Sequence, residues 1–390
     1  MKSNKKIIRT ATVASSLDIL LKGQLGYLNQ DYEIIAISGQ DQHLKNVSIR
    51  EQVQTIDVVM SRQIVPFQDL VSLYKLYKTF KNQKPLIVHS ITPKAGLLSM
   101  IAAKLARVPI RIHTFTGLVF PTRKGFMQQF LIFLDQTLCY FATHIYPEGQ
   151  GVKNDLIKYK ITKKPLKIIA NGNINGIDLD YFDPNLFSDN DKSVLKNKLK
   201  ILDNDFVFVF VGRLVKDKGI NELIQAFLEL NSETPETKLL LVGDFENNLD
   251  PLEAETLKIL KNHQSIISVG FQDDVRPYYS IANVLVFPSY REGFPNVVLQ
   301  ASAMGLPCMV TNINGCNEII QDNFNGLIIE PKNQNEILMS MKRLITTPNL
   351  LKNLSENSRT LISQKFNQKL VWKAVLDEYK LLEKNLLFKG

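Results

Sequence analysis

Strand-like apolar runs alternate with segments of helical period along almost the whole chain, and this alternation constrains the fold more than any other feature. In the first half, strands are predicted at 7–13, 32–38, 86–91, 109–115, 142–146 and 166–170. The second half repeats the plan, with strands at 206–212, 237–243, 266–271, 284–289, 307–311 and 327–330. Apolar strands that alternate with helices form parallel sheets covered on both faces. The sequence therefore predicts an α/β protein with two doubly wound domains.

The length and the segment between the halves fit this organisation. The 390 residues suffice for two domains, and a stretch near 171–191 containing Asn, Pro and Asp separates them. We expect an N-terminal domain over 1–170, a C-terminal domain over 171–365 and a final helix over 366–390 that packs back on the first domain. Because such sheets bind ligands at the carboxyl ends of their strands, a small-molecule cleft is predicted where the domains face each other.

The excess of positive over negative charge lies entirely in the first half of the chain. The chain has 47 Lys and Arg against 38 Asp and Glu, a formal net charge of +9. Residues 1–175 contribute 24 against 10, and residues 176–390 contribute 23 against 28. A basic half fits an anionic partner, which we interpret as a phosphorylated substrate or an anionic membrane surface and not as nucleic acid. Ordinary solvated lysine is the alternative.

Other patterns exclude whole classes of protein. No run of about 18 apolar residues predicts a spanning helix. The start of the chain reads as a strand and a turn, so we expect a mature cytoplasmic sequence. Cys139, Cys308 and Cys316 are odd in number and form no C-x-x-C pair, which argues against a disulfide framework or a zinc site.

A loop after the predicted strand 206–212 carries two cations. Gly212-Arg213 ends the strand, and Lys218-Gly219 precedes a predicted helix. Glycine permits a sharp turn, and the free N–H groups at the start of a helix favour anions. Arginine binds phosphate oxygens through a planar fork and lysine acts as a point charge, so the loop predicts a diphosphate site. Taken alone, the spacing equally fits a surface loop with solvated basic residues.

The loop after strand 284–289 carries a second cluster, Ser289-Tyr290-Arg291-Glu292-Gly293-Phe294-Pro295-Asn296, and again leads into a predicted helix. Gly293 in the turn and Pro295 near the helix start leave backbone N–H groups available to an anion. Glu292 is placed to accept hydrogen bonds from sugar hydroxyls, although a lone glutamate is usually only a solvated charge.

Together these motifs resemble those of the retaining nucleotide-sugar glycosyltransferases of family 4, which have the GT-B fold. The likeness also includes Gly305-Leu306-Pro307 and Asn314-Gly315 with Glu318. It covers essentially the whole chain and is strongest over 206–330. It points to the bacterial type that builds capsule or O-antigen polysaccharide.

The resemblance implies a role for each motif. Arg213 and Lys218 would bind the donor diphosphate and stabilise the departing nucleotide, while Glu292 would contact hydroxyls of the donor sugar. Backbone N–H groups near the start of the helix would lie beside the phosphates, and the loop after strand 266–271 would hold the base. The donor-binding set is then Gly212, Phe271, Gly293, Phe294, Asn296, Val297 and Gln300.

Gln300 departs from the family pattern. It stands at the family's second acidic position, with seven residues between it and Glu292, where a carboxylate normally contacts ribose hydroxyls. An amide still accepts a hydroxyl hydrogen bond but loses its charge-assisted strength, a difference of about 1–2 kcal/mol. The change puts the affinity for the donor in question. It also leaves open the alternative that the protein is a degenerate enzyme without catalytic activity.

The predictions for the first half rest on strand ends. Lys22 and Gly23 follow the first strand, where the family has a donor-facing loop, although a helix start explains them equally well. His113 is the candidate beside the transferred sugar; an alternative alignment places Thr116 there, and a histidine in a buried strand is often structural. Lys94, after strand 86–91, is the candidate contact for an acceptor phosphate.

Two helical segments of the first half carry apolar faces. On the first, the residues that share a face are Phe67, Leu70, Val71, Tyr74, Tyr77 and Phe80. The second segment, 127–141, continues an apolar band from Phe126 and follows two cations, Arg123 and Lys124. A helix of this kind can lie on an anionic bilayer, and a core helix of the first domain is the alternative.

The resemblance, together with the cations of the first loop and the absence of a metal-binding motif, implies a metal-independent retaining transferase with no cofactor. By analogy with the family, we expect it to move a hexose or N-acetylhexosamine from a nucleotide diphosphate sugar of the UDP class to a saccharide on a lipid diphosphate at the cytoplasmic face of the inner membrane. The alternatives are a non-hydrolysing nucleotide-sugar epimerase and a non-catalytic nucleotide-binding subunit. A nicotinamide dehydrogenase is disfavoured, since no G-x-G-x-x-G follows the first strand of either half.

Overall fold

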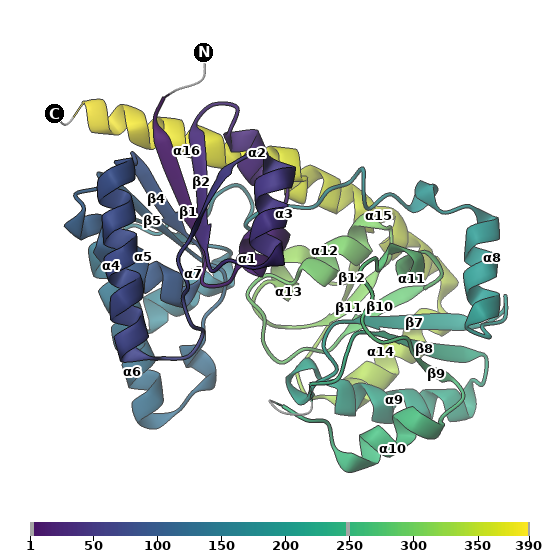
Figure 1. Ribbon diagram of the computed structural model, residues 1–390. Helices are drawn as coiled ribbons and strands as arrows, with labels where there is room; N and C mark the ends of the chain where they lie inside the picture. Colours follow the sequence, from purple (N-terminus) through teal and green to yellow (C-terminus); the bar gives the residue numbers. More distant parts are fainter. Residues whose placement is uncertain (1–3, 247–249, 389–390) are drawn as a thin grey trace. The chain divides into compact units, whose positions relative to one another are not determined.

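The chain folds into two compact units, seen in a computed structural model that describes residues 4–246 and 250–388 (Figure 1). Unit 1 comprises Met1–Gly176 and Gln368–Gly390, and unit 2 comprises Ile177–Asn367. The units divide a few residues later than the boundaries predicted at 170 and 365, and the C-terminal segment belongs to unit 1. Within the described residues, no helix is long and apolar enough to cross a membrane.

Unit 1 is built on a parallel sheet covered on both faces. The strand order is β3-β2-β1-β4-β5-β6, with bounds β1 Lys6–Thr10, β2 Glu33–Ser38, β3 Gln54–Asp57, β4 Ile87–Ser90, β5 Ile110–Phe115 and β6 His144–Pro147. Successive strand residues point to opposite faces, so Ile7 and Ile8 enter different buried clusters. One face is covered by α4 (Pro66–Gln83), α5 (Pro93–Leu105), α6 (Gly125–Phe141) and α7 (Gln150–Lys158). The other is covered by α1 (Ala14–Leu20), α2 (Gln24–Leu28), α3 (Gln42–Glu51) and α16 (Gln368–Leu387).

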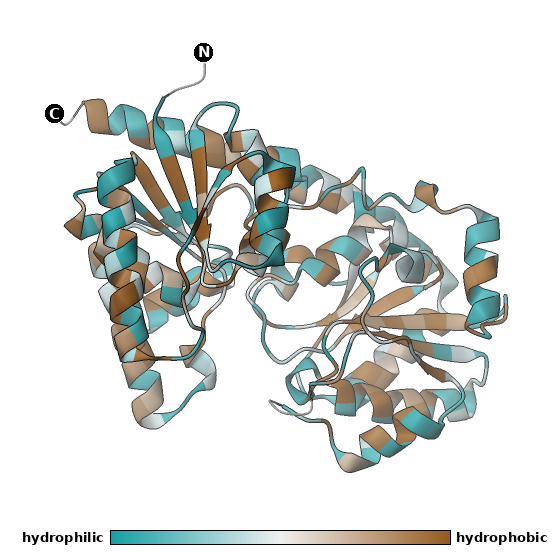
Figure 2. Ribbon diagram, in the orientation of Figure 1, coloured by the Kyte–Doolittle hydropathy of each residue, from teal (hydrophilic) through white to brown (hydrophobic). Residues whose placement is uncertain are grey.

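Unit 2 has a second parallel sheet, in the order β12-β11-β10-β7-β8-β9. Its strands are β7 Phe206–Val211, β8 Thr237–Val242, β9 Ile266–Ser268, β10 Val284–Phe287, β11 Cys308–Thr311 and β12 Gly326–Ile329. Its helices are α8 Asp189–Lys198, α9 Ile220–Glu233, α10 Ala254–Asn262, α11 Arg276–Ser280, α12 Asn296–Ala303, α13 Cys316–Ile319, α14 Gln334–Thr346 and α15 Pro348–Phe366. The strands are largely apolar, as the brown ribbons of Figure 2 show, and apart from the edge strand β9 most of their residues are buried.

Both sheets have the same topology. Counted from its own first strand, each has the order 3-2-1-4-5-6 of a dinucleotide-binding fold. The strand order reverses between β1 and β4 in unit 1, and between β7 and β10 in unit 2. Each unit therefore has one topological switch point at the carboxyl edge of its sheet, where a ligand is expected. The two doubly wound domains predicted from the strand pattern are confirmed.

Helix α16 packs on the sheet of unit 1, which confirms that the last helix returns to the first domain (Figure 1). Four of its buried residues join the cluster that contains Ile7 and Ile87: Val375, Leu376, Tyr379 and Leu382. The Tyr379 hydroxyl accepts a hydrogen bond from Arg9 Nη1 at 3.1 Å and lies 2.6 Å from Nδ1 of His89. The helix is therefore held by buried polar contacts as well as by apolar packing.

Three local predictions differ from the structure. The segment 166–170, predicted as a strand, contributes two isolated bridges and no strand, Leu166 with Ile145 and Ala170 with Gly172, and the chain turns at Ala170, whose φ is +52°. The apolar pattern does not predict strand β3, because β3 is a largely polar edge strand. Helix α8 begins inside the expected linker, where Ser188 and Asp191 form a capping box.

Candidate functional site

The switch point of unit 2 brings two predicted loops into contact. The β7–α9 loop carries Arg213 and Lys218, and Gly219 ends it with a φ of +71°. A Cβ at this glycine would lie 2.1 Å from the carbonyl oxygen of Pro288, which begins the β10–α12 loop. A side chain at Gly219 would therefore push the two loops apart.

Both predicted phosphate-binding cations are paired with carboxylates. Lys218 Nζ donates to the Glu292 carboxylate, which also accepts from Ser289 Oγ at 2.8 Å. The side chains of Lys218 and Glu292 are each 15% exposed, whereas Arg213 is half-exposed and pairs with Glu246. The structure thus brings Lys218 and Glu292 together, as expected for two groups acting at one donor site, and leaves the cations open to competition by an anionic ligand.

The start of α12 completes this edge of unit 2. Gly315, with a φ of +76°, lies so close to the preceding loop that a Cβ would be 2.4 Å from the carbonyl oxygen of Gly293. Helix α12 begins at Asn296, with Pro295 before it. The Phe294 side chain is buried against Phe366, with ring centroids 5.5 Å apart, so only its backbone is available to a ligand.

The remaining predicted donor residues lie on neighbouring elements. Val297 and Gln300 are half-buried on α12, and in the described part of the chain the Gln300 amide has no hydrogen-bond partner. Phe271 follows β9 with a ring that is 66% exposed, and its N–H donates to Asp244 Oδ1 at 2.9 Å. An exposed aromatic ring at a strand end is a suitable platform for a base. The roles of these residues stay predictions.

Unit 1 has a cavity of about 550 Å³ at its own switch point. It lies at the carboxyl edge of the sheet and extends along helices α4, α5 and α6. Its polar and loop residues are Thr12, Val13, Ser16, Arg62, Asp69, Thr92, Lys94, Gly117 and Asp135. The rest of its lining is apolar: Ile64, Pro66, Pro93, Leu97, Leu98, Phe115, Val119, Phe130, Leu131 and Leu134. This size and composition are those of a small-molecule site.

The charged groups around this cavity differ in their surroundings. Lys94 is bonded to both carboxylate oxygens of Asp69 at 2.8 Å and to the carbonyl oxygen of Gln63, so it ties the start of α5 to the start of α4. Arg62 is exposed, and its guanidinium has neither an ion pair nor a hydrogen bond within residues 4–246 and 250–388. Asp135 faces the cavity from α6, where burial raises its pKa to about 7.

His113, the predicted contact for the transferred sugar, lies inside unit 1. Its ring is 1% exposed, Nδ1 lies 2.8 Å from Ser90 Oγ, and a Cβ at Gly96 would fall 2.5 Å from the ring. Burial lowers the pKa of His113 to about 3, so the ring is neutral. In this conformation it offers a substrate no surface. Thr116 is half-buried and donates to the carbonyl oxygen of Ile91 at 3.0 Å.

The other predicted residues of unit 1 lie on the surface or against α16. Gly23 has a φ of +82°, and a Cβ there would fall 2.5 Å from the Trp372 ring of α16. This position therefore has a packing reason for glycine, apart from the predicted donor contact. Lys22 beside it is exposed, and Arg123 and Lys124 are exposed immediately before α6.

Two residues that line the unit 1 cavity, Arg62 and Asp135, are not predicted from the sequence. Arg62 follows β3, and because that strand is polar its end is not marked by the apolar pattern. Asp135 does leave a signal, since it is the only acidic residue in the apolar helix α6. No group of three or more His, Cys, Asp or Glu side chains that could hold a metal ion is found in the described residues.

Comparisons with known proteins identify the family of the chain. Residues 191–361 match the family described as "Glycosyl transferases group 1", and residues 14–148 match "Glycosyl transferase 4-like". The chain is 33% identical to the capsular polysaccharide biosynthesis glycosyltransferase CapM of Staphylococcus aureus, over 96% of this chain and 97% of CapM. It is 31% identical to the UDP-Gal:alpha-D-GlcNAc-diphosphoundecaprenol alpha-1,3-galactosyltransferase of Escherichia coli, over 79% and 78% of the two chains.

A solved structure supports the fold over the full length. The crystal structure of HepE from Anabaena in complex with UDP and glucose matches with a TM-score of 0.81 at 18% identity, covering 97% of this chain and 100% of HepE. The chain therefore belongs to the group 1, family 4-like glycosyltransferases and has the GT-B fold.

Proposed function

We propose that the protein transfers a hexose or N-acetylhexosamine from a UDP-sugar to a saccharide carried on a lipid diphosphate, with retention at the anomeric carbon, in capsule or O-antigen synthesis. The proposal depends above all on the similarity to a capsule glycosyltransferase over nearly the whole chain. A second relative is named for UDP-Gal and for an acceptor on diphosphoundecaprenol. The Lys218–Glu292 site of unit 2 and the apolar cavity of unit 1 suit these two substrates.

The chemistry needs no covalent enzyme intermediate. The bond between the anomeric carbon and the diphosphate breaks with its electron pair going to the phosphate oxygen, and the acceptor hydroxyl attacks the same face. The departing phosphate oxygen takes the hydroxyl proton. Arg213 and Lys218 stabilise the negative charge on the leaving group, a task that a metal ion performs in other transferases, and Glu292 orients the donor sugar.

A transfer assay tests the proposal. The protein is incubated with a panel of labelled nucleotide sugars and a synthetic GlcNAc-diphosphate-prenol acceptor, and the product linkage is assigned by NMR. We expect one UDP-sugar to give an α-linked disaccharide lipid. An inverted linkage would overturn the retaining mechanism, and an epimer formed without acceptor would establish the epimerase alternative instead.

Restoring the carboxylate at position 300 is expected to strengthen donor binding. In Gln300→Glu, the new carboxylate accepts charge-assisted hydrogen bonds from the ribose, which are stronger by about 1–2 kcal/mol, or on the order of 10-fold in affinity. Titration of UDP by calorimetry measures the change, and Gln264→Glu, at an exposed position in the turn before β9, serves as a control for added charge. Unchanged UDP affinity would remove Gln300 from the ribose site.

We propose further that unit 1 rests on the anionic cytoplasmic face of the inner membrane. Arg123 and Lys124 are exposed beside Phe126 and Phe133, which are 84% and 61% exposed. Replacing both cations by Gln should weaken binding to vesicles containing anionic lipid by about 30-fold at low salt, since each charge contributes about 1 kcal/mol. The control replaces Lys258 and Lys261 of α10. Equal vesicle binding by both double variants would contradict the proposed docking face.

A further inference from the structure

The cavity of unit 1 has apolar inner walls and a rim that carries a cation. Its inner walls come from apolar side chains of α5 and α6, such as Leu98 and Leu134, and from Phe115 of the sheet. Its rim includes Arg62 and the exposed Ile64 and Val119. An anionic group joined to a long apolar group would match both regions at once, because each part would meet its own kind of surface.

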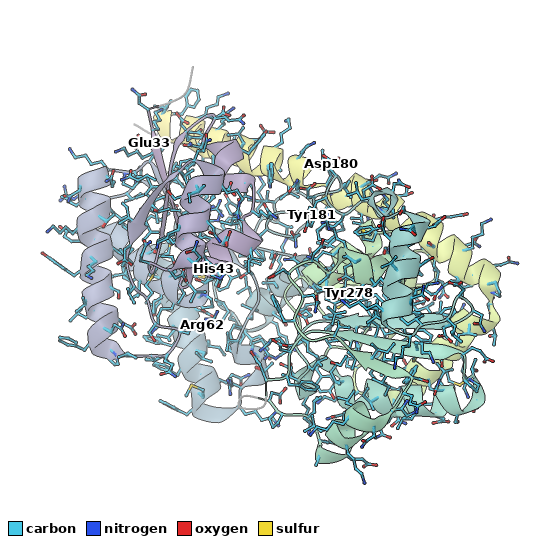
Figure 3. The ribbon with its side chains drawn as sticks, turned by 45° about the vertical axis from the view of Figure 1, so that its right-hand side comes forward. Glu33, His43, Arg62, Asp180, Tyr181 and Tyr278 are labelled. Atoms are coloured by element: carbon cyan, nitrogen blue, oxygen red, sulfur yellow. The ribbon has the colours of Figure 1, made fainter. Side chains whose placement is uncertain are left out.

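Arg62 is the cation best placed for the anionic group. Lys94, the sequence-based candidate, is neutralised by Asp69 and holds two helices together. Arg62 has no such partner in the described part of the chain and stands on the loop between β3 and α4, where it is labelled in Figure 3. An unpaired guanidinium can bind a diphosphate through two parallel hydrogen bonds without first breaking an ion pair.

The walls of the cavity continue into an exposed apolar surface. Helices α4 and α6 both pack against α5, and each carries brown segments in Figure 2. The exposed apolar side chains are Phe67, Leu70, Val71 and Tyr74 on α4, and Phe126, Met127, Phe133 and Tyr140 on α6. Of the α4 residues predicted from the sequence to share one apolar face, only Phe80 at the far end is buried. A hydrocarbon chain leaving the cavity would thus stay on apolar surface.

Asp135 is compatible with an apolar occupant. Its carboxyl lies in the lining with no cation or hydrogen-bond partner among the described residues, and burial raises its pKa to about 7. A carboxyl in these surroundings is largely protonated at slightly acid pH, so the desolvation cost of covering it with hydrocarbon is much smaller than for an ordinary aspartate.

We propose that this cavity binds the isoprenoid carbons next to the diphosphate of the acceptor lipid, and that Arg62 binds that diphosphate. The inference rests on the proposed function for the identity of the acceptor, and it adds a subsite for the lipid chain and a residue that holds the head group. Acceptor affinity should then depend on both the charge of the diphosphate and the length of the prenyl chain.

Binding of prenyl diphosphates to the unmodified protein tests the subsite without any turnover. Calorimetry with inorganic diphosphate, geranyl diphosphate and farnesyl diphosphate should give affinities that rise with chain length. Arg62→Gln should weaken farnesyl diphosphate binding by about 10-fold or more, as for the loss of a charge-assisted pair, and Arg62→Lys should recover part of it. Lys78→Gln, an exposed cation on α4 outside the cavity, should bind like the unmodified protein.

A second variant tests the apolar part. Leu134→Trp places a larger side chain in the cavity, so it should weaken farnesyl diphosphate more than geranyl diphosphate and leave inorganic diphosphate unchanged. Leu105→Trp, at an exposed position at the end of α5 and outside the cavity lining, is the matched control. Affinities that do not depend on chain length, or equal effects of the Leu134 and Leu105 variants, would overturn the subsite.

The two proposals fail in different ways. If sugar transfer occurs but its acceptor KM is indifferent to prenyl length and to Arg62, the proposed function stands and the lipid subsite is wrong. If prenyl diphosphates bind as expected but no nucleotide sugar is transferred, the subsite stands and the proposed function is wrong. The UDP-sugar KM should be unaltered in Arg62→Gln, and a matching loss of UDP affinity would contradict an acceptor-specific role.

Discussion

Lys218→Ala and Arg213→Ala are each expected to lower kcat by at least about 100-fold while the protein stays folded. Each change removes a positive charge from the loop where negative charge develops on the departing diphosphate, and loss of one such stabilising group commonly costs about 100- to 1,000-fold. The expected loss is in kcat more than in KM, because the charge on the leaving oxygen is greatest in the transition state. Steady-state kinetics with the UDP-sugar identified in the panel measures the effect.

Lys216→Ala is the matched control for these variants. Lys216 lies in the same loop, is half-exposed and faces Glu253 at 3.9 Å, so its removal should leave turnover within about twofold. Lys218→Ala also leaves the Glu292 carboxylate without its cation, and thermal denaturation separates that effect from catalysis. Near-normal turnover of a folded Lys218→Ala protein would remove this lysine from the leaving-group site.

The sheets could be predicted because their strands are buried on both faces and are therefore apolar almost throughout. Val207 to Val211 illustrates this, with five consecutive residues in the core. Strand β3 has the opposite character, since an edge strand can be polar and still pair through its backbone. The segment 166–170 is predicted as a strand because it is apolar. Its apolar residues pack against unit 1, but it pairs with the sheet only through the bridge between Leu166 and Ile145.

The two ligand sites differ in how far the sequence reveals them. The unit 2 residues stand in two short loops, and their spacing relative to Gly219 and Gly293 is visible along the chain. The unit 1 cavity is assembled from residues of several loops, of strand β5 and of helices α1, α4, α5 and α6, so its lining depends on tertiary packing that no local pattern records. His113 shows the limit of strand-end reasoning, because its direction within the strand decides that it is buried beneath Gly96.

The C-terminal helix α16 explains a glycine in the first half of the chain that the local sequence assigns to a ligand-binding loop. Gly23 follows the first strand and fits a ligand-binding loop by sequence position, yet the Trp372 ring occupies the space of its missing side chain. The same helix covers Arg9, which is fully buried and bonded to Gln24 Oε1 at 2.9 Å as well as to Tyr379. A residue more than 340 positions away thus determines why glycine is suited to position 23.

Ending the chain after Asn367 is expected to unfold unit 1. The truncation removes five buried apolar side chains of α16, each contributing about 1.5–3 kcal/mol by burial, and the total is comparable with the whole stability of a typical domain, about 5–15 kcal/mol. It also exposes the Arg9 and His89 side chains, which lose the Tyr379 hydroxyl. Circular dichroism and limited proteolysis should show loss of unit 1 structure, with unit 2 remaining protected because α16 belongs to the other unit.

A chain ending after Asn385 is the control, since the described residues that it removes, Leu386, Leu387 and Phe388, are exposed. It should melt within a few degrees of the full chain. Tyr379→Phe separates the two contributions of the helix: it keeps the ring in the core but removes the hydroxyl that Arg9 and His89 share, and should cost about 1–3 kcal/mol. A folded, protease-resistant unit 1 in the protein ending at Asn367 would mean that the sheet is stable without α16, so that the helix serves only to cover a core that is already formed.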